Sequence, residues 1–79
     1  MIDYSNLIVE AMEYVDKKID TLNPSSVDRN KLRSKIHTQI VANIKRIALL
    51  EQSNIYQEID RIFNIQMLEE LSSKLTSEV

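Results

Sequence analysis

The chain has 79 residues, a length that predicts one small domain spanning residues 1–79. It contains no Cys, no Gly, one Pro and one His, which excludes disulfides, thiolate metal sites and histidine-rich metal sites, and we expect no cofactor. A chain of this size buries only about 60% of its unfolded surface. Because 43% of the residues are hydrophobic, we expect the core to be supplemented by a protein partner, most simply a second copy in a homodimer or higher oligomer.

The beginning of the sequence, Met-Ile-Asp-Tyr, shows no basic segment followed by an apolar run of signal-peptide length. No stretch approaches the ~20 apolar residues that span a bilayer. We therefore expect a cytoplasmic protein, or one exported without a cleavable signal, and no contact with a membrane.

The net charge of −2 hides an alternation along the chain. Residues 1–22 carry five acids and two bases, residues 23–50 one acid and six bases, and residues 51–79 six acids and two bases. Such a pattern favours a bundle in which acidic helices lie beside a basic one. The alternative is a basic surface for an acidic partner or nucleic acid. The residues concerned are Arg29, Lys31, Arg33, Lys35, Lys45 and Arg46.

The first predicted helix runs from Tyr4 to Leu22, with Asp3 or Ser5 as its N-cap. Apolar residues recur at spacings of three and four on an arc wide enough to contact two neighbours. Val9 falls outside this arc and is expected to be exposed. The arc consists of Tyr4, Leu7, Ile8, Ala11, Met12, Tyr14, Val15, Ile19 and Leu22.

Pro24 marks the strongest break in the pattern, because proline lacks the N–H that a helix interior needs. Either Pro24 begins the next helix or Ser25 and Asp28 cap it. A second helix of about 24 residues, about 36 Å long, is then predicted to end near Gln52. Its apolar stripe is Leu32, Ile36, Ile40, Ile44, Ile47 and Leu50.

Ser53 or Asn54 is predicted to cap a third helix. Its first apolar face is Ile55, Tyr56, Ile59, Ile62 and Phe63, and a second stripe is Leu68, Leu71 and Leu75. The step between the two stripes leaves two alternatives at Asn64: a continuous or kinked helix, which we favour, or a break that starts a fourth helix.

Four sharper functional patterns are weak. Residues around Asn64 resemble the turn of a DNA-binding helix-turn-helix, but Glu69 and Glu70 occupy the position where phosphate contact calls for bases. Glutamates 10, 13, 69 and 70 lack the Glu-x-x-His pairs of a di-metal bundle and are expected on solvent faces. His37 has no catalytic partner at a telling spacing. The C-terminal Ser77-Glu78-Val79 resembles a carboxylate-binding peptide ligand, a pattern too short to be specific.

The sequence thus predicts an all-α fold: a small antiparallel bundle of three helices, or four if the last is broken near Asn64. We expect a non-enzymatic helical interaction module, such as an adaptor, inhibitor or assembly subunit, that acts through an apolar helical face. The alternative is a small nucleic-acid-associated regulator that uses the basic second helix. Residues expected at the protein interface are Tyr4, Tyr14, Tyr56, Phe63, Leu68, Leu71 and Leu75.

Overall fold

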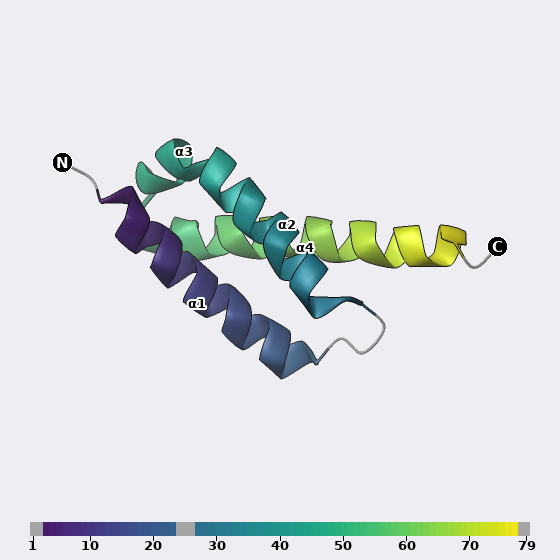
Figure 1. The fold of residues 1–79 in the computed structure, drawn as a ribbon. Helices are drawn as coiled ribbons and strands as arrows, with labels where there is room; N and C mark the ends of the chain where they lie inside the picture. Colours follow the sequence, from purple (N-terminus) through teal and green to yellow (C-terminus); the bar gives the residue numbers. More distant parts are fainter. Residues whose placement is uncertain (1–2, 24–26, 78–79) are drawn as a thin grey trace.

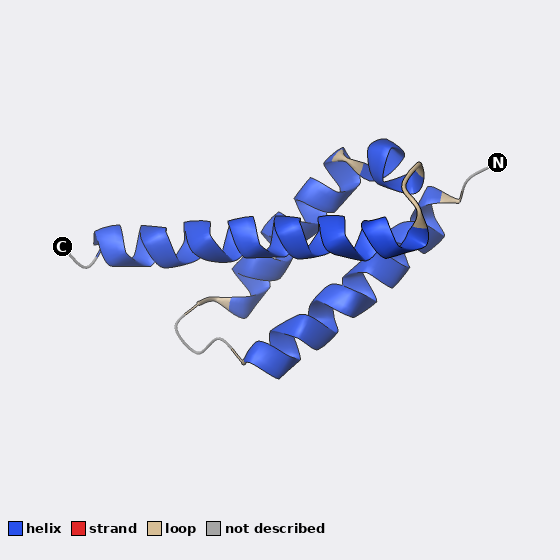
Figure 2. Ribbon diagram, turned by 180° about the vertical axis from the view of Figure 1, so that it is seen from behind, coloured by secondary structure: helices blue, strands red, loops and turns tan. Residues whose placement is uncertain are grey.

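The computed structural model of the chain describes residues 3–23 and 27–77, and within these ranges every regular element is a helix (Figures 1 and 2). The order is α1 (Tyr4–Leu22), α2 (Arg29–Ala42), α3 (Ile44–Ala48) and α4 (Gln52–Ser77). The predicted all-α fold is confirmed. The number of helices differs from the predicted three, and the extra break does not fall at Asn64.

Helix α1 has the predicted bounds because polar side chains and backbone fix both of its ends. A carboxylate oxygen of Asp3 accepts a hydrogen bond of 3.1 Å from the backbone N–H of Asn6, as an N-cap does. Ser5, the other candidate cap, lies inside the helix. At the other end Asn23 adopts a left-handed conformation, with φ 44° and ψ 59°, and donates its N–H to the carbonyl of Ile19. Asparagine is one of the few residues that tolerate this conformation, so the helix stops here.

The predicted second helix of about 24 residues is wrong, because the chain leaves the helical path at Asn43. Helix α2 begins after Asp28, whose carboxylate accepts the N–H groups of Asn30 and Lys31. It ends where the side-chain amide of Asn43 donates a 2.8 Å hydrogen bond to the carbonyl of Gln39. The same carbonyl also accepts the backbone N–H of Asn43, whose φ of −111° and ψ of 11° lie outside the helical range. The alternatives at Pro24 and Ser25 fall on residues 24–26, outside the described residues.

Helix α4 is continuous through Asn64, as favoured from the sequence, and Asn64 is exposed. The helix begins near the predicted position, but Ser53 and Asn54 lie inside its first turn. Instead the carbonyl of Glu51 accepts the N–H groups of Asn54 and Ile55, at 2.9 and 3.0 Å.

The helices form two layers (Figures 1 and 2). Helices α1 and α2 lie side by side and run in opposite directions, and α4 lies across one face of this pair. Helix α3 contacts α1, α2 and α4 near the start of α4. With 26 residues α4 is about 39 Å long, and its distal end extends beyond the other helices, which gives extents of 49 × 21 × 19 Å.

The core lies between the two layers and takes residues from all four helices. Burial of the first helical arc is confirmed at its centre, and Val9 is exposed as predicted, whereas Leu22 is exposed against the prediction. Along the second stripe, Ile44, the first residue after the break at Asn43, is only half-buried. The buried apolar residues are Ala11, Met12, Val15, Ile19, Val27, Leu32, Ile36, Ile40, Ile47, Ile59, Ile62 and Phe63.

Candidate interaction surfaces

The basic middle of the chain lies between the two acidic helices, and five of its six cations form ion pairs. Towards α1, Arg29 pairs with Asp20, and the Nε of Arg33 lies 2.7 Å from a carboxylate oxygen of Asp16. The latter contact raises the pKa of the Arg33 guanidinium. The predicted placement of acidic helices beside the basic segment is confirmed by these contacts.

Towards α4, Lys31 and Lys35 both reach Glu70, and Arg46 donates to Glu58 at 2.9 Å. Lys45 is the one cation of the six that forms no ion pair within the described residues. Five of the six cations that the alternative interpretation assigned to an acidic partner or nucleic acid are therefore paired with carboxylates of the same chain.

Glu58 lies between two guanidinium groups, those of Arg46 and Arg61. The Nε of Arg61 donates to its carboxylate at 3.2 Å. Hydrogen bonds from Arg61 first and Arg46 second lower the pKa of Glu58 from 4.5 to about 2. The Glu58 side chain is only 13% exposed, and its bond to Arg46 joins α3 to α4.

Asp60 joins α1 to α4. Its carboxylate accepts hydrogen bonds from the Tyr14 hydroxyl at 2.8 Å and from the Lys18 ammonium at 2.6 Å. Burial acts to raise the pKa of Asp60, but the two hydrogen bonds outweigh burial and lower it. The same hydrogen bond, aided by desolvation, raises the pKa of Tyr14. The Lys18 ammonium also lies 4.9 Å from the ring centroid of Phe63, a cation–π contact.

Glu70 was expected on a solvent face, and that expectation is wrong. Its side chain is only 7% exposed and is held by Lys31 and Lys35 of α2. A buried carboxylate needs such partners, because desolvating an unpaired charge is costly. The signal was present in the sequence: the buried line through Ile59 and Phe63 continues at helical spacing to Gln66 and Glu70.

Several residues predicted at the protein interface lie elsewhere. Phe63 is 1% exposed and belongs to the core. Tyr4 and Tyr14 are half-buried, and the Tyr14 ring packs against that of Tyr56, with centroids 5.0 Å apart. Tyr56, at 41% exposed, is the most accessible of the aromatic residues in this set. The aromatic part of the predicted interface therefore serves mainly to pack α1 against α4.

The predicted leucine stripe of α4 divides between two faces. Leu71 is half-buried and packs against the core. Leu68 and Leu75 point away from the core and are 63% and 66% exposed. With Ile65, which is 40% exposed, they form an apolar line on the outer side of α4. We call Ile65, Leu68 and Leu75 the outer stripe.

The described residues supply no site for a metal ion, since no three of their His, Asp and Glu side chains group together. His37 is exposed on α2. Among the described helices, none is both long and apolar enough to cross a membrane. The C-terminal Glu78 and Val79 lie outside the described residues.

Comparisons with protein-family models, with curated proteins and with solved structures find no match to this chain. The fold of the described residues is that of a small all-helical protein.

Proposed function

We propose that this protein is a non-enzymatic helical interaction module that docks through the outer stripe of α4, with a second copy of the chain as its first partner. The observation that carries the proposal is the exposure of Leu68 and Leu75, together with Ile65, on a helix that extends beyond the rest of the molecule (Figure 1). Leucines that are two-thirds exposed and aligned on one helical face gain free energy when a partner covers them.

The geometry suits a two-fold symmetric contact between the α4 helices of two copies. In such a contact the same patch serves both subunits, so Leu68 of one copy can pack beside Leu75 of the other. The distal end of α4 has no helix of its own chain alongside it in Figures 1 and 2, which leaves room for a second α4. A stripe of three residues is short beside a standard interface of 20–30 residues a side, so we expect weak association, in the micromolar range or above.

The internal ion pairs favour this proposal over a nucleic-acid-associated regulator. Phosphate contacts would have to compete with carboxylates that already hold Arg29, Lys31, Arg33, Lys35 and Arg46. The outer stripe, by contrast, is apolar surface that remains exposed among the described residues.

Sedimentation equilibrium tests the proposal directly. The unchanged chain should exceed its monomer mass of 9.2 kDa as concentration rises, and the double variant Leu68→Gln, Leu75→Gln should remain monomeric. A matched control changes two exposed apolar residues elsewhere, Val9→Gln and Leu49→Gln, and should associate as the unchanged chain does. A chain that stays at 9.2 kDa at every concentration would overturn a second copy as the partner.

A further inference from the structure

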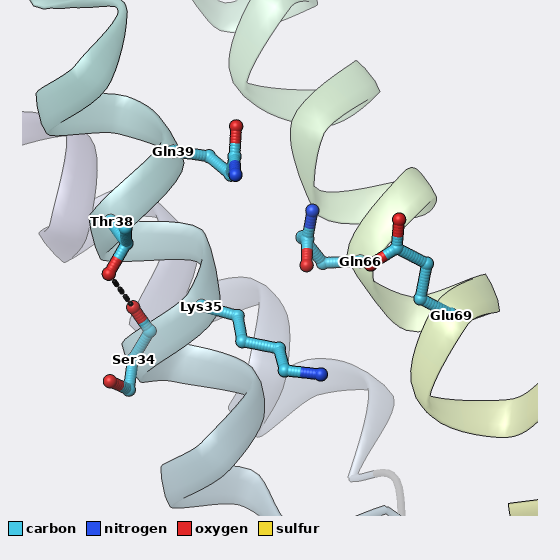
Figure 3. A pocket seen from close by; sticks show the side chains of 6 residues that line it. All are labelled: Ser34, Lys35, Thr38, Gln39, Gln66 and Glu69. Carbon is cyan, nitrogen blue, oxygen red and sulfur yellow. Dashed lines mark hydrogen bonds between the residues drawn. The ribbon is translucent and has the colours of Figure 1, made fainter. Parts of the chain in front are cut away.

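A groove with a volume of about 310 Å³ lies between α2 and α4, and the residues that line it have polar side chains (Figure 3). Helix α2 forms one wall and α4 the other. The lining residues are Ser34, Lys35, Thr38, Gln39, Gln66 and Glu69. On α4, Gln66 is two positions from Leu68, about 200° around the helix, so the side chains of these two residues point in nearly opposite directions.

Gln66 is the unusual member of this lining. Its side chain is 7% exposed, yet its carboxamide forms no hydrogen bond with any described residue. No fully enclosed nitrogen or oxygen of a described side chain lacks a partner, so the unpaired amide atoms of Gln66 open into the groove. Figure 3 shows this side chain extending from α4 towards α2, where Gln39 extends towards it. These amide atoms are accessible from the groove, so a polar group that enters the groove can reach them.

The rest of the lining restricts the chemistry of that ligand. Lys35 is paired with Glu70, and the Thr38 hydroxyl donates its hydrogen to the carbonyl of Ser34 at 3.0 Å. Glu69 adds a carboxylate at the rim, which repels phosphate, and the lining includes no aromatic ring on which a base could stack. The complement is an uncharged group that both donates and accepts hydrogen bonds.

We propose that the groove between α2 and α4 binds an amide group of a polypeptide, with Gln66 as the principal contact. A carboxamide carries two N–H donors and one carbonyl acceptor, so Gln66 can donate to the carbonyl of the bound amide and accept from its N–H. Gln39 faces the same space and offers the same groups from the opposite wall. An Asn or Gln side chain and a main-chain peptide group share this chemistry.

Nuclear magnetic resonance titration of the full chain, labelled with ¹⁵N, tests the site. Two uncharged probes separate the two sources of the amide: N-acetylglutamine N-methylamide carries a side-chain carboxamide, and N-acetylalanine N-methylamide carries main-chain amides alone. We expect a saturable shift of the Gln66 side-chain NH₂ signals at millimolar probe concentrations, as befits a ligand of few atoms. Saturation by both probes indicates main-chain recognition, and saturation by the first alone indicates side-chain recognition.

Variants that remove the carboxamide provide the control. Gln66→Met keeps the length of the side chain and should abolish the saturable shifts of neighbouring backbone signals, whereas Gln57→Met, at an exposed position of the same helix, should leave them intact. If Gln66→Met does not fold, Gln39→Met, at an exposed position, should weaken the same response. Shifts that rise linearly without saturation, or that are equal in the Gln66 and Gln57 variants, would overturn the site and leave the groove filled by water only.

Discussion

The hydroxyl of Tyr14 on α1 donates a 2.8 Å hydrogen bond to Asp60 on α4, across 46 residues of sequence. Tyr14→Phe removes this donor while it keeps the ring beside Tyr56. We expect the free energy of unfolding to fall by about 0.5–1.5 kcal/mol, the usual net value of one hydrogen bond, with a charged acceptor favouring the upper part of that range. Thermal or chemical unfolding followed by circular dichroism measures the change.

The absorbance of the Tyr14 ring, followed as pH rises, gives an independent test of its hydrogen bond to Asp60. Because the hydrogen bond to Asp60 raises the pKa of Tyr14, Asp60→Asn should bring the ionisation of this tyrosine to lower pH. Tyr14→Phe should instead delete the titration step of Tyr14 altogether. An identical absorbance titration in the unchanged chain and the Asp60→Asn variant would contradict the contact.

The Glu58 cluster predicts a loss of stability in acid. The folded-state pKa of Glu58 is about 2, below its ordinary 4.5, so its contribution is complete above about pH 4.5 and is lost as pH falls towards 2. Its two arginine partners are about half exposed, so solvent screening limits the contribution to on the order of 1 kcal/mol. Glu58→Gln should lower stability at pH 7 by about this amount and flatten the decline in acid, whereas Glu13→Gln, at an exposed position, should do neither.

The three cations that face α4 distinguish the interaction module from a nucleic-acid regulator. The triple change of Lys31, Lys35 and Arg46 to Gln should destabilise the fold more than exposed ion pairs would, because it leaves the buried Glu70 unpaired. We expect a loss of about 2–4 kcal/mol, larger than for Glu70→Gln alone, which leaves two lysines that water can solvate. We also expect no complex with duplex or single-stranded DNA in mobility shifts at low salt, and a tight complex lost on the triple change would favour the alternative function.

The stability lost on truncating core residues should reflect the break at Asn43, and not the regular isoleucine spacing seen in the sequence. Ile40 is fully buried, so Ile40→Ala should cost about 2–4 kcal/mol through lost burial and a residual cavity. Ile44→Ala should cost clearly less, because Ile44 is only half-buried, and Val9→Ala less again. Equal losses of melting temperature at positions 40 and 44 would indicate that α2 continues through Asn43.

Helical periodicity and end signals were sufficient to predict α1 and the continuity of α4. The bounds of α1 rest on local chemistry: Asp3 caps one end, and Asn23, the residue before Pro24, adopts a left-handed conformation at the other. The break at Asn43 was missed because the isoleucine spacing continues across it, and α3 resumes the helix after a single residue. The spacing of apolar residues does not reveal that the side-chain amide of Asn43 donates a hydrogen bond to the carbonyl of Gln39.

The faces of α4 were harder to predict, because two lines of residues compete for the interior. Leu68, Leu71 and Leu75 look like one stripe in the sequence, but the helices packed against α4 cover the side that carries Gln66 and Glu70. The buried face of α4 is the one that meets Lys31 and Lys35 of α2. This contact joins segments that are far apart in the sequence, so local spacing does not reveal it. The polar groove was missed for the same reason, since its two walls are far apart in the sequence.

The distal end of α4, which extends beyond the other helices in Figure 1, has a consequence for amide hydrogen exchange. Backbone amides in its last turns can lose protection by local fraying, without the opening of the core that exposes the amides around Ile59. Exchange there should be fast in dilute protein and should slow as a partner covers the helix. Protection factors along α4 would then locate the docked segment residue by residue, even where the complex is too weak to isolate.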